Sequence, residues 1–228
     1  MVFLETVPAE AADVFGDALD KACRYAELLA VDGVTRGLIG PRESERLWDR
    51  HLLNCAVVAE LLPERGLLVD IGSGAGLPGV VLAMLRPSLE VILLEPLLRR
   101  SVFLEECVAD LRLSNATVLR ARAEEKATAD IRADVATARA VAPLDRLAGW
   151  AAGLLRPGGE LLAIKGQSAE EEIAAARPVL SRLGVQSAEV LQAGHGRVVT
   201  ATTVVRVVMG GHGREERAGA QRTRRGLA

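Results

Sequence analysis

The sequence predicts a doubly wound α/β fold: a mainly parallel sheet of seven strands with helices on both faces, preceded by a helical extension. Short apolar segments alternate with helical patterns from residue 63 onward, as in βαβ units. The first of these segments runs directly into a glycine-rich turn. With 228 residues, half of them hydrophobic and a quarter charged, the chain is long enough for one well-packed domain.

Residues 1–62 are predicted to form the helical extension. Apolar residues recur at helical spacing over residues 8–30 and again over residues 42–62, so each range is predicted as an amphipathic helix. The polar face of the second helix is basic and carries Arg42, Arg46 and Arg50.

Residues 63–209 are predicted to form the core. Its parallel strands are expected where short apolar segments lie between turn or charged residues, at 67–71, 90–95, 116–119, 135–138 and 160–165. Two further segments, 186–191 and 198–208, flank a glycine-containing turn and are predicted to form an antiparallel hairpin at one edge. Residues 210–228 are rich in Gly, Ala and Arg, which predicts a basic, disordered tail.

Composition limits the possible partners and compartments. The formal net charge is −2, so RNA binding would require a local basic patch. Cys23, Cys55 and Cys107 form no CxxC pair, which argues against a zinc site or a disulfide framework and predicts packed core residues. Neither a transmembrane run nor a signal peptide is apparent, so a cytoplasmic protein without metal or membrane contact is expected.

The glycine-rich turn indicates a cofactor site. Gly72, Gly74 and Gly76 are spaced GxGxG, one residue shorter than the dinucleotide fingerprint GxGxxG. This spacing favours S-adenosylmethionine, which has no phosphate, over a nicotinamide cofactor. Ser73 and Leu77 are predicted to contact the same cofactor, with Leu77 closing over it.

Acidic residues near strand ends are further candidates. Asp70, just before the turn, is expected to offer a carboxylate to polar or cationic ligand groups. Glu95 follows Gly76 by 19 residues, close to the offset of an acid that binds ribose hydroxyls. Ala123 and Glu124 follow the third strand, where they could form a wall and an acceptor for the adenine edge.

Several motifs together resemble a known family, the bacterial small-subunit ribosomal RNA guanine-N7 methyltransferases, also called glucose-inhibited division protein B. They occur in the family's order between about residues 40 and 170. The motifs are RLWDRHLLNC (46–55), VDIGSGAGLPG (69–79), RAEE (122–125), ARAVAPL (138–144) and LLAIKG (161–166). The family usually has Ser at the position of Ala138 and an aromatic residue at that of Leu77; neither change removes a charge.

The resemblance implies a class I, Rossmann-like methyltransferase that uses S-adenosylmethionine and modifies 16S ribosomal RNA, in the small subunit or its precursor. A monomer is expected. The positions that match the family's cofactor-binding residues are Gly72, Leu77, Ala123, Glu124 and Arg139. Guanine N7 carries a lone pair and no proton, so no general base is predicted.

Arg139 is predicted as the catalytic residue, because it ends the fourth strand, where doubly wound folds bind ligands. Its planar fork would hold the methionine carboxylate or the guanine O6 and phosphate. RNA is expected to contact arginines near the cofactor loop, namely Arg42, Arg46, Arg50, Arg99, Arg100, Arg120 and Arg122.

Other interpretations remain open from the sequence. Lys165 is either an RNA contact or a solvated strand end, and His51 either reaches substrate or packs in a helix. The protein could also methylate another acceptor, bind a nicotinamide cofactor as an oxidoreductase, or serve as a non-catalytic RNA-binding or ribosome-assembly module with the same fold.

Overall fold

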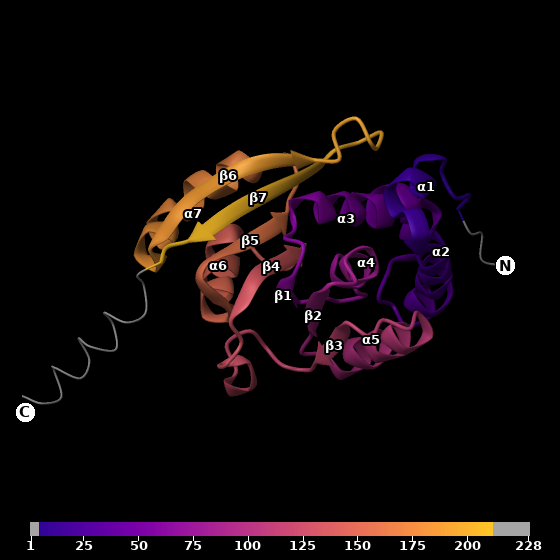
Figure 1. Ribbon diagram of the computed structural model, residues 1–228, viewed down its shortest axis with the longest axis horizontal. Coiled ribbons are helices and arrows are strands. Elements are labelled where there is room, and N and C mark those ends of the chain that lie inside the picture. The colour runs from indigo at the N-terminus through magenta and orange to yellow at the C-terminus, as the bar shows by residue number, and fades with distance from the viewer. Residues whose placement is uncertain (1–4, 212–228) are drawn as a thin grey trace, which may run out of the picture.

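The computed structural model describes residues 5–211 and contains a single sheet of seven strands (Figure 1). The strands are β1 Gly66–Ile71, β2 Leu89–Leu94, β3 Ala116–Leu119, β4 Ala133–Arg139, β5 Leu155–Ile164, β6 Val185–Ala193 and β7 Thr202–Met209. Their order is β3-β2-β1-β4-β5-β7-β6. The first five strands run parallel, whereas β7 is antiparallel to both β5 and β6. The predicted fold class is therefore confirmed.

The helices divide into two groups that cover the two sides of the sheet. Those after β1 are α4 Gly79–Leu85, α5 Leu98–Asp110, η6 Lys126–Thr128, α6 Leu144–Leu154 and α7 Ala169–Leu183. Helices α4 and α5 share one apolar cluster with the N-terminal helices, and α6 and α7 build a second cluster around β4, β5 and β7. Figure 1 shows α6 and α7 beside the hairpin strands, with the N-terminal helices on the other side of the molecule.

The N-terminal extension is helical, but each predicted helix is divided into short pieces. These are α1 Glu10–Phe15, η1 Gly16–Ala18, α2 Leu19–Leu28, η2 Leu29–Gly33, η3 Pro41–Arg46, η4 Trp48–Leu53, α3 Asn54–Ala56 and η5 Val57–Leu61. Segments η2 and η4 are π-helical. Because π-helical hydrogen bonds join residues five apart, Trp48 and Leu53 share the buried side of η4.

Ion pairs reinforce the packing of the extension on α5. Arg24 Nε lies 2.9 Å from Asp110 Oδ1, and Arg36 Nη2 lies 2.6 Å from Glu106 Oε2. Since the extension also shares an apolar cluster with α4 and α5, it forms part of the same packed unit as the core. Residue 62 therefore marks a boundary in the sequence between extension and core, but the two segments pack together.

The hairpin differs from the sequence-based prediction at its turn. β7 begins at Thr202, not at residue 198, because the connection after β6 folds onto the N-terminal helices. The Gly194 N–H donates to Glu60 Oε1 at 2.8 Å, and a Cβ at Gly194 would collide with Val57. The predicted strand 90–95 likewise ends one residue early, which leaves Glu95 in the loop after β2.

The three cysteines lie in or against the apolar core, as predicted. Cys55 and Cys107 are buried and Cys23 is partly buried, all with free thiols. No helix within residues 5–211 is long and apolar enough to cross a membrane. The predicted disordered tail lies outside the described residues, apart from its first two positions.

Candidate functional site

The glycine-rich loop after β1 adopts a backbone that favours glycine. Gly72, Gly74 and Gly76 have φ angles of +67°, +60° and +100°, which L-residues with a Cβ rarely adopt. The N–H groups of Gly72 and Ser73 both donate to the Leu94 carbonyl, at 2.8 and 3.0 Å. The loop is thereby fixed against the end of β2, at the carboxyl edge of the parallel strands.

A cavity of about 610 Å³ opens at this edge of the sheet. Eight of the nine predicted cofactor residues line it: Gly72, Ser73, Gly74, Leu77, Glu95, Ala123, Glu124 and Arg139. These residues lie at the end of a strand or in the loop that follows it, and they come from four different strands. Doubly wound sheets bind their ligands at this place.

Gly76 is the exception, because it faces away from the cavity. A Cβ at this position would lie 2.6 Å from Val80 Cγ2 and would also collide with the Tyr25 hydroxyl. Its glycine is therefore required for close packing against the N-terminal extension, and it contributes no wall to the cavity.

Glu95 is buried, with 1% of its surface exposed, and both of its carboxylate oxygens accept backbone hydrogen bonds. Oε2 accepts from Gly74 N–H at 3.0 Å and Oε1 from Leu97 N–H at 2.9 Å. Each oxygen can accept a second hydrogen bond. The side chain can thus fix the glycine loop and still accept a ligand hydroxyl from the cavity that it lines.

Asp70 does not have the predicted role. It is fully buried beneath the loop and does not line the cavity. Its oxygens accept hydrogen bonds from Thr137 Oγ1 at 2.9 Å and from Gly79 N–H at 3.0 Å, so it connects β1 to β4 and to the start of α4. Burial raises the pKa of Asp70 to about 6, against the opposing effect of these hydrogen bonds.

Sequence reasoning missed several residues around the cavity. The Tyr25 hydroxyl, on α2, donates to the Ala75 carbonyl at 2.6 Å and supports the loop from below. Trp150, on α6, and Ile39, from the extension, form part of the cavity wall. Their contribution depends on contacts between segments far apart in the chain, for which the sequence carries no local signal.

A second cavity, of about 510 Å³, adjoins the first. Four residues line both, namely Glu43, His51, Arg139 and Ala140. Lys165 also lines the second cavity, but its Nζ donates to Ala142 O at 2.9 Å and to Glu172 Oε2 at 2.7 Å. The Lys165 ammonium group is thus neither fully solvated nor unpaired, because it is hydrogen-bonded to a carbonyl and a carboxylate of the same chain.

Arg139 stands at the junction of the two cavities and contacts the N-terminal extension. Its Nη2 lies 2.9 Å from His51 Nδ1, and its Nη1 donates to the Arg50 carbonyl at 3.3 Å. His51 Nε2 in turn lies 2.8 Å from Glu43 Oε2. Burial, together with the charge of Arg139, lowers the pKa of His51 to about 4.

Three of the seven predicted RNA-contacting arginines line the two cavities. All seven are exposed except Arg100, which is half-buried. Arg100 and Arg122 line the first cavity and Arg50 lines the second. Within the described part of the chain, no cluster of His, Cys, Asp or Glu is arranged to hold a metal ion.

Comparisons with known proteins agree with this architecture. The sequence matches the model of the GidB family, described as rRNA small subunit methyltransferase G, over residues 18–200. It is 62% identical over 204 residues to ribosomal RNA small subunit methyltransferase G of Thermobifida fusca, covering 89% of this chain and 86% of that protein. The protein of the same name from Streptomyces coelicolor is 58% identical over 207 residues, covering 91% and 87%.

Solved structures show the same fold at low sequence identity. A SAM-dependent O-methyltransferase from Thermotoga maritima has a TM-score of 0.55 at 15% identity, over 69% of this chain and 65% of that one. A putative S-adenosyl-L-methionine-dependent methyltransferase from Methanococcus maripaludis has a TM-score of 0.56 at 14% identity, over 83% and 93%. From its sequence relatives, the chain belongs to the GidB family of small-subunit ribosomal RNA methyltransferases.

Proposed function

We propose that this protein transfers the methyl group of S-adenosylmethionine to N7 of a guanine in 16S ribosomal RNA. The observation that supports this most strongly is the pair of adjoining cavities with Arg139 in their common wall. One cavity suits the methyl donor, and the other offers cationic and polar side chains to a nucleotide. Family membership supports the same assignment.

The first cavity fits S-adenosylmethionine. Beside Gly74 the nearest atom to a hypothetical Cβ is the Gly72 carbonyl oxygen, 3.8 Å away, so the space along this backbone is open. Glu95 offers carboxylate oxygens for ribose hydroxyls, and Ala123 and Glu124, which also line the cavity, offer a small wall and an acceptor. When bound, the cofactor supplies an activated methyl group.

The acceptor chemistry requires positioning more than proton transfer. Guanine N7 has an in-plane lone pair and no proton, so its methylation needs no general base. Good alignment alone can provide about 7–11 kcal/mol of barrier reduction. Arg139 is assigned to hold the guanine O6 or an adjacent phosphate, since a guanidinium offers several N–H donors in a fixed plane.

The RNA backbone would contact the exposed arginines around the two cavities. The chain as a whole carries a net charge of −2, so this local concentration of arginine must provide the attraction. We expect the enzyme to act as a monomer in the cytoplasm, on the small subunit or its precursor.

The decisive test is transfer of a labelled methyl group from S-adenosylmethionine to small subunits that lack the modification, followed by nucleoside analysis. The expected product is N7-methylguanosine. A different methylated nucleoside, or label in protein, would reassign the acceptor. Cofactor binding without transfer to any ribosomal substrate would instead indicate a non-catalytic assembly role.

A further inference from the structure

A hydrogen-bonded chain of three side chains links the N-terminal extension to Arg139. It runs from Glu43 on η3, through His51 on η4, to Arg139 at the end of β4. The bond between Glu43 and His51 is 2.8 Å long, and that between His51 and Arg139, 88 positions apart in sequence, is 2.9 Å long. His51 is 9% exposed, so most of its surface is buried although it lines both cavities.

The chemistry of the three groups fixes the direction of each bond. A guanidinium has five N–H donors and no acceptor, so Arg139 must donate and His51 Nδ1 must accept. The imidazole proton therefore resides on Nε2, which donates to the Glu43 carboxylate. This assigns His51 as a neutral ring in the Nε2–H tautomer.

The charges around His51 agree with this assignment. Arg139 faces the ring from β4, Arg50 is its neighbour on η4, and Glu43 faces it from η3. A second positive charge on the ring would be repelled by both arginines, and protonation at Nδ1 would break the bond from Arg139. The Glu43 carboxylate favours the protonated ring, but burial outweighs its effect.

The arrangement leaves part of the Arg139 guanidinium available for a ligand. One N–H of Nη2 is directed to His51, and one N–H of Nη1 is directed to the Arg50 carbonyl. The remaining three of the five N–H donors of Arg139 have no hydrogen-bond partner among the described residues. Both anchoring contacts come from η4, so this segment sets the plane of the guanidinium in the wall of the two cavities.

We propose that His51 is a positioning residue: as a neutral acceptor held by Glu43, it orients the Arg139 guanidinium toward the acceptor nucleotide. The proposal rests on the proposed methyl transfer, because Arg139 is assigned its role there. It predicts that an acceptor at the position of Nδ1 is what the reaction needs from residue 51.

Two substitutions separate this role from simple packing. In His51→Asn, Oδ1 can stand where Nδ1 stood and accept from Arg139, while the contact with Glu43 is lost. In His51→Gln, the amide can still donate to Glu43 from the position of Nε2, but the acceptor toward Arg139 is lost. We expect kcat/KM for methyl transfer to small subunits to fall about tenfold further in His51→Gln than in His51→Asn.

The same pair should be compared in an Arg139→Lys background. There the planar fork is absent, so the difference between Asn and Gln at position 51 should disappear. Melting temperatures measured in parallel report any general damage to the fold. Equal activities of the two single variants in the presence of Arg139, or an undiminished difference between them in the Arg139→Lys background, would overturn the proposal.

A measurement on the unaltered protein does not depend on catalysis. The ¹⁵N chemical shifts of the His51 ring report which nitrogen carries the proton, and the Nε2–H tautomer is expected at pH 7. The Nδ1–H tautomer or a charged ring would overturn the positioning role. If this tautomer is found but no methyl transfer occurs, the assigned function fails while the geometry of the chain stands.

Discussion

At the scale of single residues, two buried ionisable side chains, His51 in the wall of the site and Asp70 beneath the glycine loop, have opposite pKa shifts. The pKa of His51 is lowered to about 4 and that of Asp70 is raised to about 6, in both cases mainly by burial. Both shifts favour the neutral form of the group. The two residues therefore affect the free energy of unfolding in opposite directions as the pH changes.

The contribution of His51 can be isolated by His51→Asn. Between pH 6.5 and about 4 the unfolded chain binds a proton at this histidine and the folded protein does not, so acidification favours unfolding. From pH 7 to pH 5, the wild type should lose about 2 kcal/mol more unfolding free energy than the variant. Asp70 is present in both proteins, so its opposite contribution cancels. Parallel denaturant titrations at the two pH values measure the difference, and identical losses would show that the pKa of His51 is the same in the folded protein as in the unfolded chain.

Glu95 provides a second prediction at this scale. In Glu95→Gln the amide nitrogen replaces an oxygen that accepts from Gly74 or Leu97, so one of these backbone bonds is lost. Calorimetry should show that the affinity for S-adenosylmethionine falls about tenfold or more, since the glycine loop and a hydroxyl acceptor are both disturbed.

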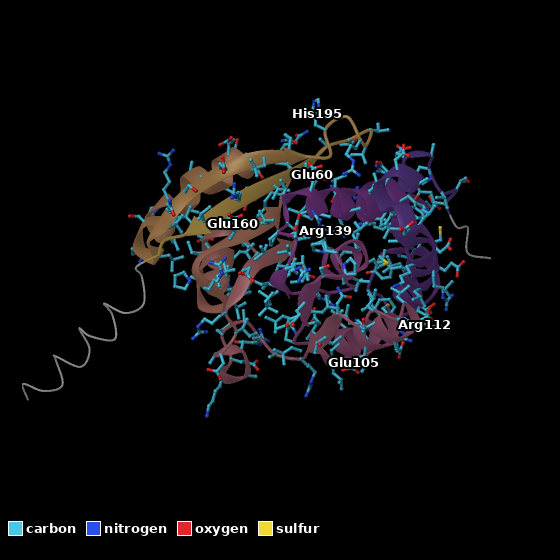
Figure 2. The ribbon with its side chains drawn as sticks, in the orientation of Figure 1. Glu60, Glu105, Arg112, Arg139, Glu160 and His195 are labelled. Atoms are coloured by element: carbon cyan, nitrogen blue, oxygen red, sulfur yellow. The ribbon has the colours of Figure 1, made fainter. Side chains whose placement is uncertain are left out.

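The matched control is Glu105→Gln. Glu105 is exposed on α5, and Figure 2 shows it at the outer edge of the molecule, away from Arg139. Its substitution should leave the affinity unchanged. Equal affinities for the two variants would remove Glu95 from the cofactor site.

At the scale of elements, the start of α4 is packed so closely that it has no room for a side chain. A Cβ at Gly79 would collide with Leu93 of β2 and would lie 2.6 Å from Asp70 Oδ2. Gly79→Ala should therefore destabilise the protein by about 1–3 kcal/mol, the usual cost of overpacking. Gly149, exposed in α6, has no atom within 4 Å of a hypothetical Cβ.

Gly149→Ala is accordingly the control, and it should stabilise α6 by about 0.5–1 kcal/mol. Urea denaturation of both variants measures the two effects. A neutral Gly79→Ala would mean that α4 can move away from the sheet, which contradicts the close contact with Asp70 and Leu93.

The elements that the sequence predicted well are those whose signals are local. Strand β1 is a short apolar run followed by glycines, and alternation of such runs with helical patterns was sufficient to find all seven strands. The hairpin turn was placed less well because its course depends on Glu60, which is 134 positions before Gly194. The sequence prediction used a single helical spacing of apolar residues. Such a pattern does not distinguish α, 3₁₀ and π segments, so the division of the N-terminal helices was not predicted.

The site was predictable to a similar extent. Gly72 and Glu95 follow strand ends and Arg139 ends a strand, and topology alone brings such residues to one edge of the sheet. The role of Asp70 was predicted wrongly, because its position two residues before the loop does not reveal that Thr137 and Gly79 enclose it. The link from Glu43 through His51 to Arg139 depends on tertiary packing and could not be read from spacing.

At the scale of the whole molecule, a weakly acidic protein has to bind a polyanion. The arginines around the cavities should hold RNA mainly through phosphates, so affinity should fall steeply with salt concentration. Arg99→Ala should weaken binding of small subunits and reduce the slope of log affinity against log salt by about 1. Filter binding over a range of salt concentrations measures the slope.

Arg112→Ala serves as the control for this experiment. Arg112 follows α5, and Figure 2 shows it at the margin of the molecule, away from Arg139. It should leave the slope unchanged. If Arg112→Ala and Arg99→Ala changed the slope equally, RNA would not be confined to the edge of the sheet that carries the cavities.

The central claim is methylation of one guanine at N7, and it is tested most directly in the RNA itself. N7-methylguanosine makes an RNA strand sensitive to cleavage by borohydride and aniline, so the modified position can be mapped by primer extension. The test uses cells whose chromosomal gene for this enzyme is deleted and that carry the gene on a plasmid. The wild-type gene should give one new cleavage position in 16S RNA, and Arg139→Lys should give the same cleavage at a much reduced level. The same cleavage pattern with and without the gene, or cleavage restored in full by Arg139→Lys, would contradict the account.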